Sequence, residues 1–218
     1  MKSAQCPFQF LTASYLVRIQ EIKASTLGEL AEGLENCSDA SIFFHTFQSL
    51  GRHHFLTQGF SNDFAQWILT ACNRPELAEQ LAILDIRDYT SLAELRADLR
   101  RIVRGYCREH ATIAAQQAFE KFFFCEGVEV TTPLGIQVWD LREFCAGLEK
   151  LSHASLYYHF IASRLRLHLR TNDFSYWLEN CLGLKSLACR INHIDIYTNT
   201  LDSVRSLLTH LIEPELNS

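Results

Sequence analysis

The sequence predicts a mainly α protein made of two pseudo-symmetric helical half-domains, each opened by a short extended piece or a β-hairpin. Three observations predict this class. Only 4 Pro and 9 Gly interrupt the 218 residues, so chain-breaking signals are scarce. Amphipathic segments that start with helix-capping residues follow one another along the chain. A long segment of the first half also recurs in the second half, which indicates an internal duplication.

The internal similarity is clearest between residues 27–54 and 141–168. These segments align without a gap, and 12 of their 28 positions are identical. Chance would give about two identities at average composition. Further on, "NDFAQW" (62–67) matches "NDFSYW" (172–177). We therefore expect a first helical copy over residues 1–110 and a second over 111–218, either as two domains or packed together as one compact domain.

Each copy is expected to begin with extended chain. In the first copy this is "ASYLVRIQEIKAS", which is rich in β-branched and aromatic residues. In the second copy, "GVEVTTPLGIQVW" shows two alternating runs around a Pro-Leu-Gly sequence. Alternation on both sides of a turn sequence is typical of a β-hairpin.

Helices are expected to follow, because residues that cap helices precede the amphipathic segments. A short polar side chain at such a position accepts hydrogen bonds from the first turn. Expected starts in the first copy are the capping box Thr26–Glu29, the segment "SDASIFFHTFQSLGRHH", Asn62, Pro75 and the capping box Ser91–Glu94. The second copy repeats three of these signals, with Asp140–Glu143, the segment "SHASLYYHFIASRLRLH" and Asn172.

A polar stripe is predicted on the second helix of each copy. The pattern S-x3-H-x3-S-x2-R occurs twice, and in an unbroken helix this spacing places all four side chains on one face. The candidate ligand-binding residues are Ser41, His45, Ser49, Arg52, Ser155, His159, Ser163 and Arg166.

The stripes allow three interpretations. Arginine, serine and histidine together suit a small anionic or sugar-like ligand, since they supply a planar donor fork, hydroxyl groups and a group that titrates near neutral pH. Alternatively, the histidines act as acid and base in a hydrolase or transferase, in a cleft between the copies. In the third interpretation, the stripes only hold packed helices together or face water. No catalytic residue is assigned.

We expect no metal and no cofactor. The sequence has no H-E-x-x-H motif, no C-x-x-C pair and neither of the glycine-rich phosphate-binding motifs. The histidines and the aspartates Asp63 and Asp173 have the right chemistry for a metal site. However, these aspartates follow helix caps, where a carboxylate interacts favourably with the helix dipole.

Specific nucleic-acid binding is not expected. The formal net charge is -5, and no helix-turn-helix motif is recognisable. A basic stripe follows the fifth helix, but acidic residues interrupt it, so a solvated face is the preferred interpretation. Its members are Arg96, Arg100, Arg104 and Arg108, and Arg101 lies beside them.

A cytoplasmic location without membrane contact is expected. No signal peptide is expected, and the sequence contains no apolar run of 18 residues. The 8 Cys are therefore interpreted as reduced thiols that pack as small apolar side chains.

The chain resembles a family of bacterial and archaeal proteins classed as a domain of unknown function. The resemblance rests on "TASYLVR" (12–18), "SIFFH" (41–45), "HHFL" (53–56), "NDFAQW" (62–67), "SLYYH" (155–159) and "NDFSYW" (172–177). It implies a mostly helical protein without an assigned activity, found beside sugar-handling enzymes. Together with the stripes, it favours a non-enzymatic binding or interaction module for a small anionic or sugar-like ligand or for a partner protein.

Overall fold

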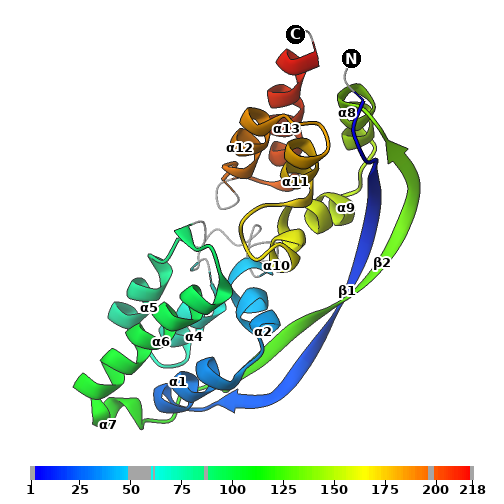
Figure 1. The fold of residues 1–218 in the computed structure, drawn as a ribbon. Helices are drawn as coiled ribbons and strands as arrows, with labels where there is room; N and C mark the ends of the chain where they lie inside the picture. Colours follow the sequence, from blue (N-terminus) through cyan, green and yellow to red (C-terminus); the bar gives the residue numbers. More distant parts are fainter. Residues whose placement is uncertain (1–2, 49–59, 61, 86–87, 196–198, 217–218) are drawn as a thin grey trace. The chain divides into compact units, whose positions relative to one another are not determined.

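The computed structural model describes residues 3–48, 60, 62–85, 88–195 and 199–216 (Figure 1). The chain divides into two compact units. The central unit contains Leu16–Val128, and the terminal unit contains Met1–Tyr15 together with Glu129–Ser218. Each unit is described separately below.

Two long strands form the sheet. β1 (Phe8–Ala24) and β2 (Phe122–Val138) each have 17 residues and pair with one another as a two-stranded sheet. Figure 1 shows them running in opposite directions, so the pairing is antiparallel. Both strands pass from one unit into the other. Each unit therefore contains part of β1 and part of β2.

Helices cover the strand segments of the central unit. These are α1 (Leu27–Asn36), α2 (Asp39–Phe43), the π-helical turn η1 (Phe44–Gln48), α4 (Asp63–Thr70), α5 (Pro75–Ala82), α6 (Leu92–Glu109) and α7 (Ala111–Ala114). Phe122 and Phe124 alternate with exposed neighbours along β2 and are buried beneath these helices. Alternate residues of a strand point to opposite faces, so one face of the β2 segment packs on the core.

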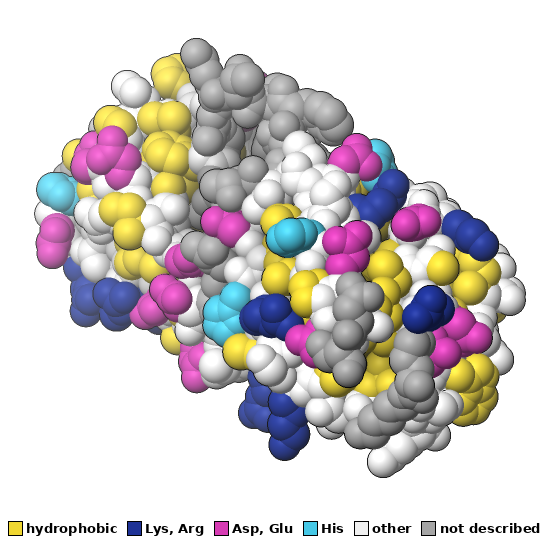
Figure 2. All heavy atoms as spheres, turned by 90° about the horizontal axis from the view of Figure 1, so that it is seen from above, with side chains coloured by type: hydrophobic (Ala, Val, Ile, Leu, Met, Phe, Trp, Pro, Cys, Tyr) yellow, Lys and Arg dark blue, Asp and Glu magenta, His cyan; other side chains and the backbone are white. Residues whose placement is uncertain are grey.

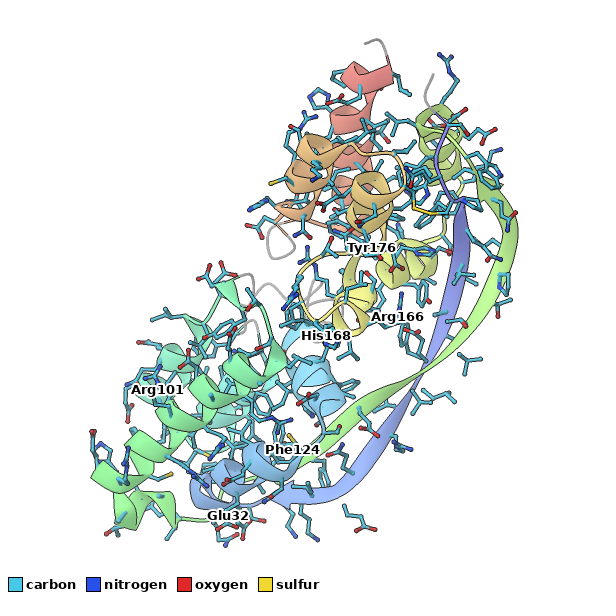
Figure 3. All side chains as sticks on the ribbon, in the orientation of Figure 1. Glu32, Arg101, Phe124, Arg166, His168 and Tyr176 are labelled. Atoms are coloured by element: carbon cyan, nitrogen blue, oxygen red, sulfur yellow. A yellow bond between two sulfur atoms is a disulfide. The ribbon has the colours of Figure 1, made fainter. Side chains whose placement is uncertain are left out.

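A glycine lets α1 approach β2 closely. A Cβ atom at Gly33 would overlap the ring of Phe124, which is completely buried. The ring therefore lies against the backbone of α1 (Phe124 is labelled in Figure 3). The terminal unit has a similar contact, in which a Cβ atom at Gly147 would meet the ring of Phe10.

The terminal unit is also helical apart from its strand segments. Its helices are α8 (Leu141–Glu149), α9 (His153–Tyr157), the π-helical turn η3 (Tyr158–Ala162), α10 (Ser163–Arg166), α11 (Asp173–Asn180), α12 (Lys185–Asn192) and α13 (Leu201–Leu216). Phe8 contacts Phe144 and Trp177 edge to face, and the Trp177 indole N–H donates to the carbonyl of Cys6 over 2.8 Å.

The predicted helix caps are confirmed. The side chains of Thr26, Asn62 and Ser91 accept hydrogen bonds from the first turns of α1, α4 and α6, and Pro75 is the first residue of α5. These signals depend on residues at most three positions apart, so the sequence alone contains them.

The predicted fold class is wrong. The structure is not two pseudo-symmetric helical half-domains, because two 17-residue strands pair as one antiparallel sheet and run through both units. The predicted internal repeat has no support in the structure. The expected hairpin is also wrong, since β2 continues through the Pro-Leu-Gly sequence, with Gly135 at a φ of 72°. Alternation predicts a strand but does not identify its partner.

The interpretation of all cysteines as reduced thiols is wrong for two of them. Cys6 and Cys181 form a disulfide in the terminal unit, with their Cα atoms 5.7 Å apart. Their sequence separation is 175 residues. No local spacing motif predicts such a pair, because only the fold brings the two residues together.

Candidate functional site

His159 lies inside the terminal unit with both ring nitrogens hydrogen-bonded. The residue is 2% exposed and belongs to η3. Its Nε2 accepts the backbone N–H of Leu11 on β1 over 2.8 Å. Its Nδ1 lies 2.8 Å from Oδ2 of Asp173, at the first turn of α11. The imidazole thus connects a strand, a π-helical turn and the start of a helix.

His45 has the same kinds of partner inside the central unit. It is 4% exposed and belongs to η1. The backbone N–H of Cys125 on β2 donates to Nε2 over 2.8 Å, and Nδ1 lies 2.8 Å from Oδ2 of Asp63. Asp63 is the first residue of α4.

These contacts determine the protonation of both rings. A nitrogen that accepts a backbone N–H carries no proton, so Nε2 is the acceptor in each ring. The proton is then on Nδ1 and is donated to the aspartate. Each imidazole is neutral in this arrangement, and its only basic lone pair is already in use. A role for His45 and His159 in ligand binding stays a prediction, and it would require breaking the bond to the strand.

The π-helical turns explain why the polar stripe divides. The sequence prediction assumed 100° per residue along one α-helix, but η1 and η3 interrupt that helix in the two units. A π-helical turn holds more residues, so the side chains that follow it change face. Within the described residues, Ser41, His45, Ser155, His159 and Ser163 are buried, whereas Arg166 is exposed. Ser49 and Arg52 lie outside the described residues.

Ser163 contributes to the structure of the site. Its hydroxyl donates to the carbonyl of His159 over 2.6 Å and accepts the backbone N–H of Asp173 over 3.2 Å. This serine connects the end of η3 to the first turn of α11, next to the His159–Asp173 pair. Ser155 is completely buried and lies 3.1 Å from the hydroxyl of Ser152, the N-cap residue of α9.

Among the described residues of the stripes, the guanidinium of Arg166 is the part that reaches solvent. It lies between two carboxylates: Nη2 donates to Oδ2 of Asp173 over 2.8 Å, and Nη1 donates to Oε1 of Glu129 over 3.4 Å. The same group lies over the ring of Tyr158, 4.4 Å from its centroid. Tyr15 donates its hydroxyl to the other oxygen of Glu129. Figure 3 labels Arg166 on α10. We call Arg166, Glu129, Asp173, Tyr15 and Tyr158 the Arg166 cluster.

The Arg166 cluster is polar, partly exposed and negatively charged. The side chains of Arg166, Glu129 and Asp173 are 37%, 27% and 21% exposed. Two carboxylates and one guanidinium leave a formal charge of -1, because the adjoining His159 is neutral. Burial and the charge of Glu129 raise the pKa of Tyr15, so its hydroxyl stays protonated and acts as a donor. The cluster therefore offers both donors and acceptors at one place.

A buried carboxylate in the central unit was missed by the sequence analysis. Glu126 on β2 is 6% exposed and accepts hydrogen bonds from Arg18, Gln20 and Ser38. The bonds from Ser38 and Arg18 hold the pKa of Glu126 below its usual range. Ser38 also caps α2, so the carboxylate fixes β2 to the start of that helix. Glu126 occupies an inward position of the alternating pattern, which is the signal that could have revealed it.

The basic stripe of α6 is largely paired with acids. Arg96 donates to Asp39, Arg100 and Arg104 contact Glu35, and Arg101 contacts Asp98. Figure 2 shows the same mixture on the face it draws, where Lys and Arg side chains lie beside Asp and Glu side chains. Neighbouring acids weaken the field that would attract a polyanion.

The described part of the chain contains neither a cluster of metal-binding side chains nor a membrane-spanning helix. Among those residues, no group of three or more His, Cys, Asp or Glu side chains is arranged to hold a metal ion. No described helix combines the length and apolar character needed to span a membrane.

Three comparisons relate the chain to known proteins. The structure of OrfY from Thermoproteus tenax is similar, with a TM-score of 0.86 and 27% sequence identity. That similarity covers 100% of this chain and 99% of the OrfY chain. Among curated proteins, none matches this chain. The model of a family of unknown function, DUF5752, matches residues 5–213. The chain therefore belongs to the DUF5752 family of unknown function.

Proposed function

We propose that this protein is a non-enzymatic binding protein and that the Arg166 cluster contacts a sugar-like ligand. The observation that carries the proposal is the partly exposed guanidinium of Arg166, set between the carboxylates of Glu129 and Asp173 and over the ring of Tyr158. Sugar hydroxyl groups both donate and accept hydrogen bonds. A place with adjoining donors, acceptors and an aromatic ring matches that chemistry.

Charge favours a neutral polyol over an anion at this cluster. The formal charge of -1 would repel a phosphate or carboxylate, and Arg166 already binds two carboxylates. A neutral sugar avoids this repulsion and can bridge Arg166 and Glu129 through neighbouring hydroxyl groups. The small anionic ligand that the sequence also allowed is therefore the weaker choice for the Arg166 cluster.

The alternative function is a hydrolase or transferase that uses His45 and His159 as acid and base. A general base needs a lone pair within reach of the substrate proton. In both histidines Nε2 accepts a strand N–H and Nδ1 faces an aspartate. Because both nitrogens of each ring are engaged in this way, the hydrogen bonds disfavour the acid–base alternative and support a structural role for the two rings.

Calorimetric titration with paired ligands tests the proposal. We expect neutral mono- and disaccharides to bind more tightly than the corresponding sugar phosphates. Glu129→Gln removes one negative charge and should reduce this preference, whereas Arg166→Gln should abolish sugar binding. Arg190→Gln is the matched control, because Arg190 forms a surface ion pair with Glu215. Tighter binding of the phosphates, or unchanged binding by Arg166→Gln, would contradict the proposal.

A further inference from the structure

A pocket of about 180 Å³ lies within the central unit, away from the His45 contacts. Its walls come from the chain that follows α4, from α7 and the turn after it, and from the first residue of α1. Figure 1 shows α7 next to the start of α1, in agreement with the hydrogen bond from Ala118 N–H to the carbonyl of Ser25. Every described residue that lines the pocket belongs to this one unit.

One part of the pocket is apolar. Leu27, Ala71 and Ile113 contribute aliphatic surface, and Phe119 adds an aromatic ring. Phe119 is 86% exposed, which is unusual for so large an apolar side chain. A ligand with an apolar body would cover part of this surface and remove it from water.

The other part of the pocket is polar and carries a cation. Arg74 lines it beside the carboxamides of Asn73, Gln116 and Gln117. The guanidinium donates from Nη1 to the carbonyl of Asn73 over 2.9 Å and from Nη2 to Oε1 of Gln116 over 2.8 Å. A guanidinium has five N–H donors, so donors remain at both Nη atoms. The buried Nε has no hydrogen-bond partner among the described residues.

The positive charge of Arg74 has neutral partners. Among the ion pairs of the described residues, none includes Arg74, and both of its acceptors are amide oxygens. The carboxylate of Glu76 interacts electrostatically with Arg74. Its hydrogen bond, however, is made with the hydroxyl of Tyr106 over 2.6 Å. Burial raises the pKa of the neighbouring Cys72 thiol to about 12, so that thiol is neutral at pH 7. The guanidinium therefore keeps N–H donors for an external anion, although the nearby Glu76 carboxylate weakens that attraction.

We propose that this pocket binds a small carboxylate with an apolar body, its carboxylate on Arg74 and its body against Leu27, Ile113 and Phe119. An arginine fork pairs with a carboxylate through two parallel N–H···O bonds. The volume is sufficient, since a protein cavity of about 150 Å³ accepts benzene. This site goes beyond the proposed sugar function, because it lies in the other unit and uses different residues.

Benzoate and benzamide are the probes for the first experiment. They share one shape and differ in charge, so their comparison isolates the contribution of the carboxylate. By calorimetry we expect benzoate to bind the wild-type protein at least about tenfold more tightly than benzamide. Arg74→Gln should abolish this preference, and Arg74→Lys should keep part of it. Arg101→Gln, which removes an exposed arginine of α6 paired with Asp98, should leave benzoate binding unchanged.

Alkylation of Cys72 gives a second measurement that needs no variant. Cys72 lines the pocket, whereas Cys189 is exposed and belongs to the terminal unit. Benzoate should slow the alkylation of Cys72 and leave that of Cys189 unchanged, as measured by peptide mass spectrometry. Equal affinity for the two probes, unchanged benzoate binding by Arg74→Gln, or no saturable binding up to about 10 mM would overturn the proposal. Glu129→Gln should leave benzoate binding unchanged. Failure of the proposed benzoate site can therefore be distinguished from failure of the proposed sugar site.

Discussion

The backbone N–H of Leu11 donates a 2.8 Å hydrogen bond to Nε2 of His159. In a two-stranded sheet each strand has only one neighbour, so half of its backbone groups must find partners elsewhere. His159 satisfies one of these groups for β1, and His45 does the same for Cys125 of β2. The conspicuous histidines of the sequence therefore hold the strands against the helices of their own units.

Truncation of His159 should be strongly destabilising. His159→Ala leaves a cavity and removes the acceptor of the part-buried Leu11 N–H, so we expect the free energy of unfolding to fall by about 3 kcal/mol. The control is His153→Ala, since His153 also pairs with an aspartate, Asp202, but both side chains are more than half exposed. That change should cost about 0.5 kcal/mol or less. Urea denaturation measures both values.

A partial rescue would identify the hydrogen bond as the cause. His159→Gln keeps an acceptor for Leu11 and should recover part of the stability that His159→Ala loses. Equal losses for His159→Ala and His153→Ala would show that the buried contacts of His159 contribute nothing.

The tautomer of His159 and His45 gives a prediction for NMR. Because Nε2 accepts a backbone N–H in each ring, both imidazoles should carry their proton on Nδ1. Two-bond ¹H–¹⁵N correlation spectra distinguish the two neutral tautomers, and His159→Gln assigns one set of signals. Solvent-exposed imidazoles usually favour the other tautomer, so His153 serves as the internal reference. Protonated Nε2 atoms at His159 and His45 would be incompatible with the strand bonds.

Local signals in the sequence were reliable because their partners are close in the chain. The N-caps at Thr26, Asn62 and Ser91 depend on residues at most three positions away, and all three were predicted. The candidate stripe was different. Its geometry assumed a continuous α-helix, and nothing in "SIFFHTF" distinguishes a π-helical turn from an α-helical one.

Distant pairings explain the remaining differences from the sequence predictions. β1 pairs with a strand that begins about a hundred residues later, and alternation of residue type contains no information on that partner. The acceptors and donors of the histidines are likewise distant: Leu11 and His159 are 148 positions apart. The two histidines are buried because each hydrogen-bonds to a strand that packs against the helices of its unit.

Gly33 is expected to be irreplaceable in α1. Gly33→Ala places a Cβ atom on the completely buried ring of Phe124, so the ring or the helix must shift and we expect a loss of about 2 kcal/mol. Gly105→Ala in α6 is the matched control, because its new Cβ would meet no atom within 4 Å. There the better helix propensity of alanine should stabilise by about 0.5–1 kcal/mol. Stabilisation by both changes would contradict the close packing of α1 on β2.

Glu126 predicts an acid-dependent loss of stability. Its folded-state pKa is lowered by bonds from Ser38 and Arg18, so its contribution is complete above the unfolded-state pKa of about 4.3 and disappears as the pH falls through the folded-state value. Glu126→Gln should lower the free energy of unfolding by about 1–2 kcal/mol at pH 7, and this difference should shrink towards pH 3. Glu32→Gln on the exposed face of α1 should change it by no more than about 0.5 kcal/mol at either pH.

The disulfide between Cys6 and Cys181 should change the number of cysteines that can be alkylated. Alkylation of the unfolded protein without reductant should add six groups, and reduction should raise this number to the 8 Cys of the chain. The bond closes a loop with a sequence separation of 175 residues, which restricts the unfolded chain. Cys6→Ser should therefore lower the free energy of unfolding by about 2–5 kcal/mol, whereas Cys189→Ser at the surface should not. Eight groups added before reduction would show that the two thiols are not bonded in solution.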